Sequence, residues 1–302
     1  MKFTIYQESR IGKRASNQDR VAYCYSRDAL LMVIADGMGG HLHGELAAHI
    51  AVQTIAGGFK REARPSLADP ARFLFQALSH SHQAINDLAA SRGLAEAPRT
   101  TCVACVVQRD AAYWAHAGDS RLYLLRRRRL LAQTRDHTRV QMMLDQGLID
   151  AADAAAHPAR NRVFSCLGGM HPPQIDLSQE TALESGDIIA LCSDGAWAPL
   201  GNDLLVHTLA DSNPMHSVPR ALDLADARAG ENGDNLSLIA MQWNVSHAGG
   251  APSNVSTLTM PLDAINTELG EAGGGHGPTD LSEDDIERTI IEIRTAIQKF
   301  SD

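Results

Sequence analysis

The sequence predicts an α+β fold, because its strand and helix signals are grouped rather than strictly alternating. Runs rich in β-branched, aromatic or alternating apolar residues predict strands at 3–8, 21–25, 29–35, 100–108, 112–117, 121–126, 187–193 and 236–243. Alanine-rich stretches with helical spacing predict helices at 43–58, 70–92, 137–147 and 215–229. The chain has 302 residues, of which 44% are apolar, so it can bury one large core and still carry an appendage.

The composition changes near Ser246, where small and polar residues take over, so the main domain is expected to span residues 1–245. A flexible linker is expected over 246–278. An amphipathic helix is expected over 279–302, where isoleucines recur at helical spacing after a capping residue, Ser282. Two roles stay open for this helix: packing on its own domain, or self-association and docking to a partner.

The charge and the cysteines limit the class of protein. The formal net charge of −9 argues against general affinity for nucleic acid or an anionic membrane surface. No apolar stretch reaches the ~20 residues of a membrane helix, and the first residues lack the apolar segment of a secretory signal. Five cysteines in a chain of this length do not suggest a disulfide framework. A cytoplasmic protein is therefore expected.

Two local motifs have a structural interpretation. Cys102 and Cys105 have redox or zinc-ligand spacing, but they lie in a predicted strand, where positions three apart point to opposite faces. We therefore expect two buried structural thiols. The run Arg126–Arg129 follows a strand and is expected to form a solvated hairpin turn rather than a nucleic-acid site.

Aspartates recur at the ends of predicted strands. Asp36 ends the apolar run ALLMVIAD and is followed by glycines, and Asp194 follows DIIALCS in the same way. Asp119 lies after Gly118, and Asp234 stands just before a strand. A single Asp-Gly pair is as readily an ordinary turn. Four such turns in one chain predict carboxylates that converge at the edges of sheets.

Oxygen ligands with almost no nearby His or Cys select hard cations such as Mg²⁺ and Mn²⁺. A pair of such ions can activate a water and bind both the attacking and the leaving oxygen of a phosphoryl group. Arg14, just before a strand, offers a planar guanidinium that matches phosphate oxygens, although a solvated surface arginine is the more common case. Together these features favour hydrolysis of a phosphoester.

An ordered set of motifs carries a family resemblance. The set comprises Gly12-x-Arg14-x-x-Asn17-Gln18-Asp19, Asp36-Gly-Met-Gly-Gly-His41, Thr100-Thr101, Gly118-Asp119-Ser120-Arg121, Asp136-His137, Cys192-Ser193-Asp194-Gly195 and Asp234-Asn235. In order and spacing it resembles the metal-dependent protein phosphatases of the 2C type, in their bacterial form. The resemblance covers roughly residues 4–243.

The resemblance implies a central antiparallel β-sandwich flanked by helices on both sides, a four-layer αββα fold with a dinuclear or trinuclear metal centre at one end. It implies that Asp36 bridges two metals, that the Gly37 carbonyl ligates one of them, and that Asp194 and Asp234 complete the first site. Asp119 with Asp194 would hold a third metal. Arg14 would bind the substrate phosphate, and Asp19 would orient a water or ligate directly.

Two positions depart from the eukaryotic members of the family. Those members have a glutamate where Gln18 stands, so the second metal here has one carboxylate ligand fewer. They also have a histidine, proposed as the general acid, where this chain has Met38. Residues 138–165 resemble the family's flap segment beside the active site.

The expected activity is hydrolysis of phosphoserine and phosphothreonine in proteins by direct attack of a metal-bridging hydroxide, with two to three Mn²⁺ or Mg²⁺ ions and no phosphoenzyme. The expected partners are a phosphoprotein substrate and a cognate bacterial Ser/Thr kinase. Analogy with the family extends this expectation to a kinase that serves a secretion system. Two alternatives are a regulatory protein that has lost catalysis on the same fold, and a phosphodiesterase or nuclease. The first would lack a metal aspartate, and the second would need a basic groove.

Overall fold

Strand β3 (Ala29–Asp36) shows how the sequence builds the layers. Leu30, Met32 and Ile34 belong to one buried hydrophobic cluster. The alternate residues Leu31 and Val33 belong to another. Successive side chains of a strand point to opposite faces, so a strand that is apolar at every position must lie between two hydrophobic layers.

The structure is a computed structural model that describes residues 1–38, 43–150, 153–154, 157–244 and 265–268. All of them belong to a unit that spans Met1–Gly270. In this part of the chain, no helix has the length and apolar character needed to cross a bilayer.

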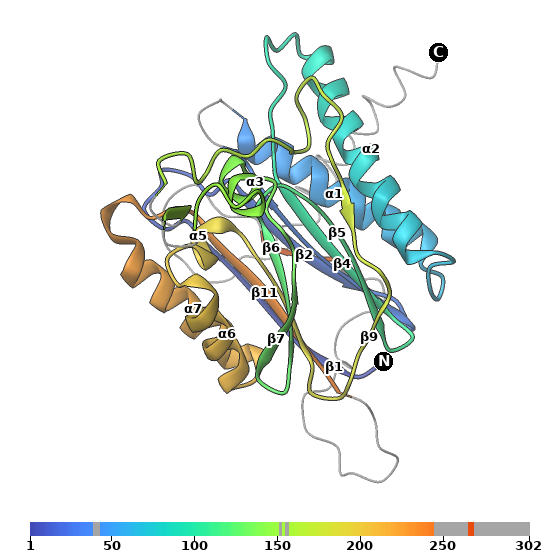
Figure 1. Cartoon of the computed structure of the whole chain (residues 1–302). Coiled ribbons are helices and arrows are strands. Elements are labelled where there is room, and N and C mark those ends of the chain that lie inside the picture. The colour runs from blue at the N-terminus through green and yellow to red at the C-terminus, as the bar shows by residue number, and fades with distance from the viewer. Residues whose placement is uncertain (39–42, 151–152, 155–156, 245–264, 269–302) are drawn as a thin grey trace. The chain divides into compact units, whose positions relative to one another are not determined.

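The strands form two antiparallel sheets (Figure 1). The first has the order β1-β11-β10-β6-β7, with bounds β1 Phe3–Arg10, β11 Leu236–Trp243, β10 Ile188–Cys192, β6 Arg121–Arg126 and β7 Arg129–Gln133. The second has the order β12-β2-β3-β4-β5-β8, with bounds β12 Ile265–Glu268, β2 Asp19–Tyr25, β4 Cys102–Gln108, β5 Ala111–Ala117 and β8 Asp176–Leu177. A short strand, β9 (Thr181–Ala182), also pairs with β5.

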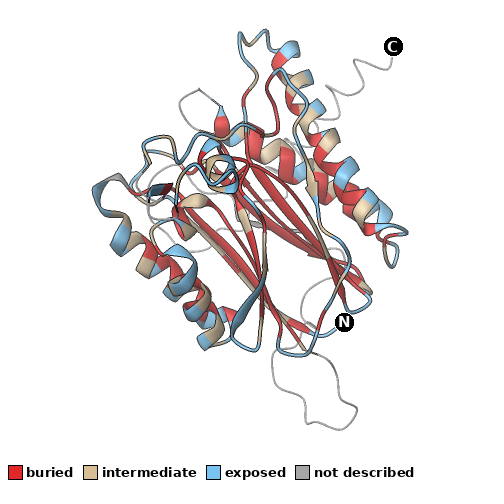
Figure 2. Cartoon of the chain, viewed as in Figure 1, coloured by how far each residue is buried: buried red, intermediate tan, exposed pale blue. Residues whose placement is uncertain are grey.

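Helices cover the outer face of each sheet. Helices α1 (Gly44–Glu62) and α2 (Pro70–Ser91) pack on the second sheet, and α5 (Asp194–Trp197), α6 (Gly201–Asp211) and α7 (Pro214–Ala229) pack on the first. A short helix, α3 (Arg139–Asp145), and a 3-10 turn at Gly230–Asn232 are also present. Figure 2 shows the buried residues concentrated on the strands and on the inward faces of the helices.

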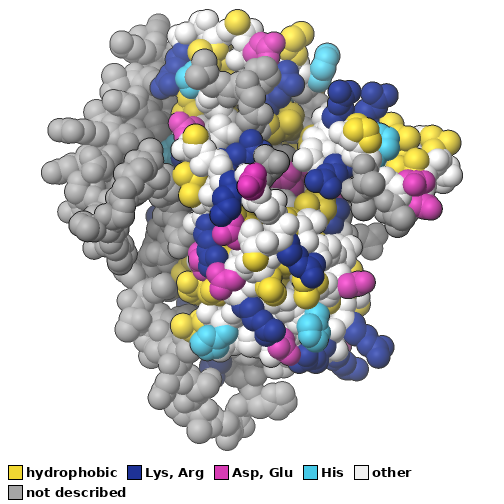
Figure 3. Space-filling view, turned by 90° about the vertical axis from the view of Figure 1, so that its left-hand side faces the viewer, with side chains coloured by type: hydrophobic (Ala, Val, Ile, Leu, Met, Phe, Trp, Pro, Cys, Tyr) yellow, Lys and Arg dark blue, Asp and Glu magenta, His cyan; other side chains and the backbone are white. Residues whose placement is uncertain are grey.

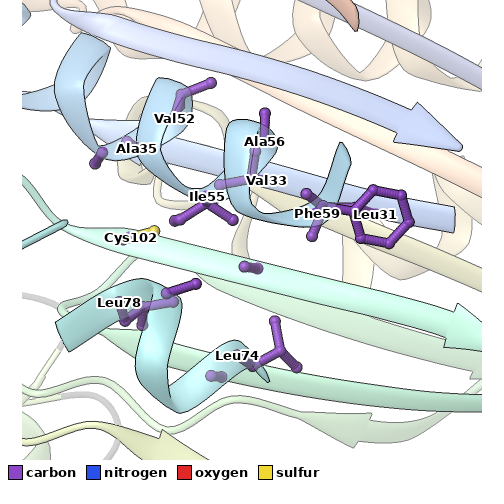
Figure 4. Packing of buried hydrophobic residues seen from close by; sticks show 14 of the residues in the cluster. Leu31, Val33, Ala35, Val52, Ile55, Ala56, Phe59, Leu74, Leu78 and Cys102 are labelled. Atoms are coloured by element: carbon purple, nitrogen blue, oxygen red, sulfur yellow. The ribbon is translucent and has the colours of Figure 1, made fainter. Parts of the chain in front are cut away.

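Three hydrophobic clusters correspond to the three contacts between four layers. One lies between the sheets, one beneath α1 and α2, and one beneath α5, α6 and α7. In the cluster under α1 and α2, Val52, Ile55 and Phe59 pack over Leu31 and Val33 (Figure 4). The predicted four-layer αββα fold is therefore confirmed.

Most elements match the sequence prediction. The eight predicted strands occur, and each ends within two residues of its expected bounds. Helix α6 and strands β7, β8 and β9 were not predicted, because they are short or lack a clear apolar period. Cys102 and Cys105 are both buried and free, and they lie in the two different clusters on either side of β4, as expected.

The arginine run forms the expected hairpin turn. Arg127 and Arg128 join β6 to β7 with φ angles of 51° and 65°. Both side chains are exposed and paired with acids. Arg126 anchors the start of the turn through Asp187, which is 1% exposed, with an Nη2–Oδ2 distance of 2.7 Å. These pairs explain an arginine run on an acidic protein without a nucleic-acid ligand.

Most of the C-terminal segment lies outside the described residues. Strand β12 lies within the segment expected to be a linker, and it pairs antiparallel with Val21–Cys24 of β2. The helix predicted over 279–302 lies outside the described residues, and its role stays a prediction.

The core between the sheets gives a stability prediction. Ile189 in β10 is fully buried in that cluster, so Ile189→Ala should lower the free energy of unfolding by about 2–5 kcal/mol. Leu131→Ala on β7, where the side chain is 49% exposed, should cost less than about 1 kcal/mol. Urea denaturation of both variants measures the difference. Equal losses would contradict the assignment of Ile189 to the inter-sheet core.

Candidate metal centre

The predicted aspartates lie at strand ends on one end of the sandwich. Asp19 begins β2 and Asp36 ends β3, and the two are directly opposite each other in the antiparallel ladder. Asp194 follows β10, and Asp234 precedes β11. Asp119 lies in the turn from β5 to β6. Because Cys192 pairs with both Arg121 and Leu238, the ends of β10, β6 and β11 coincide.

The electrostatics of Asp36 show how close these groups are. Burial raises the pKa of Asp36 well above its ordinary value, and the neighbouring carboxylates raise it further. The neighbours that act on it are Asp19, Asp194, Asp119 and Asp234. The structure therefore brings all five predicted carboxylates into one cluster.

Asp19 is the deepest of the five, with 1% of its surface exposed. Its Oδ2 accepts a hydrogen bond of 2.8 Å from Ser193 Oγ. Its Oδ1 is buried and accepts no hydrogen bond from a described residue. Burial raises the pKa of Asp19 to about 6, although hydrogen bonds from Ser237 and Ser193 oppose the rise. A buried carboxylate oxygen without a donor is a position that a cation or a water can fill.

Asp194 begins the four-residue helix α5. Burial raises its pKa to about 6, and the charges of Asp234 and Asp19 add to the rise. The next residue must be small, because a Cβ on Gly195 would lie 2.1 Å from the Asn235 carbonyl oxygen. This close approach of two backbones brings Asp194 next to the strand that follows Asp234.

The Asp119 turn depends on glycine. Gly118 has φ of +117°, and a Cβ there would lie 2.5 Å from Thr101 Cβ. Trp197 Nε1 donates to the Asp119 carbonyl oxygen at 3.0 Å, and Thr101 Oγ1 lies 2.7 Å from Ser120 Oγ. Burial, followed by the charge of Asp194, raises the pKa of Asp119 well above its ordinary value. The turn thus holds a 5%-exposed carboxylate next to Asp194.

Arg14 lies at the rim of the cluster. Its Nη2 is 2.7 Å from Asp234 Oδ2, and 56% of its side chain is exposed. The loop that carries it is held by Asn235, whose Nδ2 donates to the carbonyls of Ile11 and Ser16. Asn235 Oδ1 also accepts from the Gln18 backbone N–H at 2.8 Å. The guanidinium is therefore positioned beside the carboxylates while it still faces solvent.

Gly37 makes the turn after Asp36. Its N–H donates to the Gln18 carbonyl at 3.1 Å, and a Cβ on it would lie 2.4 Å from the backbone of Gly44. Met38 donates its N–H to the Arg99 carbonyl at 3.0 Å. Residues 39–42, which include His41, lie outside the described residues.

Several supporting residues had no role assigned from the sequence. Ser193 and Asn235 were noticed only as neighbours of aspartates, and the structure makes them hydrogen-bond partners of Asp19 and of the Arg14 loop. Arg121 holds Asp136 through two bonds of 2.7 and 2.8 Å and stacks 3.3 Å from the Trp197 ring centroid. The signal for these residues in the sequence was their position within the motifs that contain the aspartates.

Comparisons with known proteins agree with this architecture. The family model described as Protein phosphatase 2C matches residues 6–221. The chain is 32% identical over 237 residues to protein phosphatase PhpP of Streptococcus pneumoniae, covering 78% of this chain and 95% of PhpP. It is 31% identical over 267 residues to serine/threonine protein phosphatase PstP of Mycobacterium tuberculosis, covering 86% of this chain and 49% of PstP. It thus spans about half the length of PstP.

Solved structures give the same result. The crystal structure of the M. tuberculosis phosphatase PstP has a TM-score of 0.71 and 30% identity, over 80% of this chain and 99% of that one. A catalytic domain of PstP in complex with two manganese ions has a TM-score of 0.67 and 29% identity, over 80% and 97% of the two chains. PppA of Pseudomonas aeruginosa, described as a key regulatory component of T6SS, has a TM-score of 0.66 and 28% identity, over 80% and 98%. With this fold, this cluster of aspartates and these relatives, the chain belongs to the metal-dependent protein phosphatase 2C family.

Proposed function

We propose that this chain hydrolyses phosphoserine and phosphothreonine in proteins at the cluster of five aspartates. The observation that carries the proposal is the convergence of Asp19, Asp36, Asp119, Asp194 and Asp234 on one end of the sandwich, with Arg14 paired to Asp234 at the rim. Five carboxylates repel one another when they are ionised, so bound cations would stabilise their proximity near neutral pH.

The donor atoms suit Mg²⁺ or Mn²⁺. The proposed ligands are Asp36, the Gly37 carbonyl, Asp194 and Asp234, with Asp119 and Asp194 for a further ion, which gives two to three ions in all. Carboxylate and carbonyl oxygens are the ligands that hard divalent cations prefer. The buried Oδ1 of Asp19, which has no donor among the described residues, and the strongly raised pKa of Asp36 are features that a bound cation would relieve.

When bound, such ions supply a Lewis acid that activates water and neutralises phosphate charge. The protein supplies the geometry. Arg14 presents its exposed guanidinium edge to the phosphate oxygens, and its ion pair with Asp234 fixes the orientation of the guanidinium. The hydrogen bond from Ser193 to Asp19 supports the proposal that Asp19 orients the attacking water.

The partner of this reaction is a phosphoprotein, and we propose that a cognate Ser/Thr kinase makes that substrate in the cytoplasm. The similarity to PppA, described as a key regulatory component of T6SS, supports a role in the regulation of such a system. The exposed flap around α3 is proposed to contact the substrate protein, because Met142 and Leu148 expose 42% and 65% of their surfaces there.

The two alternative functions are less well supported. A regulatory protein without catalysis would have lost a metal aspartate, and all five are present. A nuclease would need a basic groove. On the face presented in Figure 3, Lys and Arg side chains are interspersed with acidic ones, in agreement with pairs such as Arg10–Asp223 and Arg220–Asp211.

Removal of one carboxylate tests the proposed activity. Wild-type protein should release phosphate from a phosphothreonine peptide only with Mn²⁺ or Mg²⁺, and Asp194→Asn should lower kcat by at least about 100-fold. Asp203→Asn, an exposed residue of α6, is the matched control and should retain wild-type activity. Metal-independent release, or full activity in Asp194→Asn, would overturn the proposal.

Arg14 should act on substrate binding and the transition state. Arg14→Ala should reduce kcat/KM by roughly 10- to 100-fold, the usual loss for a hydrogen bond to a charged group. Arg14→Lys should recover only part of it, because an ammonium cannot form the two parallel bonds of a guanidinium. Arg27→Ala, at a 75%-exposed arginine paired with Asp28, serves as the control. Steady-state kinetics with the same peptide give the comparison, and wild-type kinetics for Arg14→Ala would exclude the assigned role.

Metal binding should depend on pH. The pKa values of Asp19 and Asp194 are about 6 in the metal-free fold, above the ordinary 3.8. Their contribution to stability is therefore complete below about pH 4 and is lost as pH rises through about 6. Protons and cations compete for these carboxylates, so Mn²⁺ should stabilise more strongly at pH 7.5 than at pH 5.

Thermal unfolding with Mn²⁺ and with EDTA measures this effect. At a 100-fold excess over Kd and pH 7.5, Tm should rise by roughly 5–10 °C. The rise should be clearly smaller at pH 5, and Asp194→Asn should diminish it at both values. An equal rise at the two pH values would show that these carboxylates do not bind the metal.

A further inference from the structure

A second cluster of titratable groups lies beside the Asp119 turn. The ligand atoms of His116, His137 and Asp176 all lie within 4.8 Å of one another. The two histidines are 4% and 3% exposed, and their rings stack with centroids 4.6 Å apart. The register of β5 and β8 places Asp176 directly opposite His116.

The hydrogen bonds of this cluster assign both ring tautomers. His116 Nε2 lies 2.8 Å from the Arg135 carbonyl, which only accepts, so Nε2 carries the proton. His137 Nδ1 accepts from the Gly118 N–H at 3.2 Å, so its proton is on Nε2, the atom 3.2 Å from Asp176 Oδ2. A cation on that Nε2 would need a free lone pair there. The two rings are therefore held by their bonds to the Arg135 carbonyl and the Gly118 N–H. The His137 Nε2–H lies close to Asp176 Oδ2 without an aligned hydrogen bond, and His116 Nδ1 has no hydrogen-bond partner among the described residues.

Asp176 is suited to this arrangement. Partial burial raises its pKa, but the hydrogen bond from Gln174 and the interaction with His137 outweigh that effect, and the pKa lies below its ordinary value. A carboxylate that stays charged favours the tautomer of His137 with the proton on Nε2. Nδ1 is then left as an acceptor.

His137 satisfies both backbone groups of Gly118. Its own N–H donates to the Gly118 carbonyl at 2.9 Å, while its Nδ1 accepts from the Gly118 N–H. Gly118 has φ of +117° and immediately precedes Asp119. Gly118 lies just beyond β5, so His137 rather than a partner strand satisfies its N–H and carbonyl. These two bonds, together with the Trp197 bond to the Asp119 carbonyl, hold the turn that carries Asp119.

The same residue is joined to the flap segment. The Phe164 N–H donates to the His137 carbonyl at 2.8 Å, and Thr138 pairs with Val163 in an isolated bridge. The rings of His137 and Phe164 lie 5.6 Å apart. His137 therefore contacts the Asp119 turn on one side and the C-terminal end of the flap on the other.

We propose that His137 is a positioning residue, which fixes the Asp119 turn for cation binding through its Nδ1 acceptor and connects that turn to the flap. The inference rests on the proposed function, in which Asp119 is a metal ligand. It adds a residue that contacts neither the metal nor the phosphate, and it gives the Asp136-His137 motif a physical role.

Two conservative variants separate positioning from general stability. In His137→Asn the amide Oδ1 takes the place of Nδ1 and keeps an acceptor for Gly118. In His137→Gln the acceptor moves to the far end of the side chain and the Gly118 N–H loses its partner. His207→Gln, an exposed histidine of α6, is the matched control. Asp176→Asn tests the contribution of the Asp176 charge next to His137 Nε2.

The measurements are Mn²⁺ titrations of full-length protein, by calorimetry without substrate and by peptide hydrolysis. His137→Gln should raise the Mn²⁺ concentration for half-maximal activity about tenfold and weaken the weakest calorimetric binding step by a similar factor. His137→Asn should stay within about threefold of wild type, and Asp176→Asn should fall between the two. Thermal unfolding of each variant confirms that the comparison is made on folded protein.

Three results would overturn the proposal. The first is an equal loss of Mn²⁺ affinity in His137→Asn and His137→Gln. The second is wild-type Mn²⁺ affinity in His137→Gln. The third is a tenfold weaker Mn²⁺ response in folded His137→Asn, a result that would count against the proposal even if His137→Gln failed to fold. Zn²⁺ binding that needs both His116 and His137 would show instead that the cluster is a cation site. Absence of Mn²⁺-dependent activity in wild type would refute the proposed function, whereas the calorimetric comparison tests His137 separately.

Discussion

The mutual repulsion of carboxylates is the constraint on which this structure depends. Asp36 has four other aspartates close enough to raise its pKa, and Asp19 is almost completely buried among them. Such an arrangement costs free energy unless the backbone is rigid and cations are bound. The sandwich supplies the rigidity, because each of these residues begins, ends or adjoins a strand whose neighbours are fixed by antiparallel pairing.

Polar residues around the aspartates form hydrogen bonds with buried polar groups of the site. Ser193 and Asn235 connect segments that are far apart in sequence, and each satisfies groups that burial would otherwise leave without partners. Gly195 is required where two backbones approach too closely for a Cβ, and Gly118 where a Cβ would overlap the Thr101 side chain. The carboxylate cluster is held by several hydrogen bonds and close backbone approaches, each made by one or two residues. Its motifs are therefore short and scattered along the chain.

Arg14 and His137 lie next to the aspartate cluster and link it to the proposed substrate-binding part of the site. Arg14 is exposed and paired with a proposed ligand, so it can bind phosphate without leaving the cluster. His137 contacts both the Asp119 turn and the flap, so the proposed third cation site and the segment proposed to contact the substrate are joined through one residue. A phosphatase that acts on proteins benefits from such a connection, because binding of a substrate at the flap can then favour an ordered Asp119.

The sequence by itself determined the layers and the location of the aspartates. The nearly continuous apolar runs of β3 and β4 are typical of strands buried on both faces. Cys102 and Cys105 fall on opposite sides of β4, as their spacing requires. The tertiary structure alone decided which carboxylates approach one another, that Asp176 lies opposite His116, and that Asn235 holds the Arg14 loop. The physical reason is that hydrophobic periodicity is local and repeats along the chain, whereas a polar contact joins single residues distant in sequence and leaves no periodic signal.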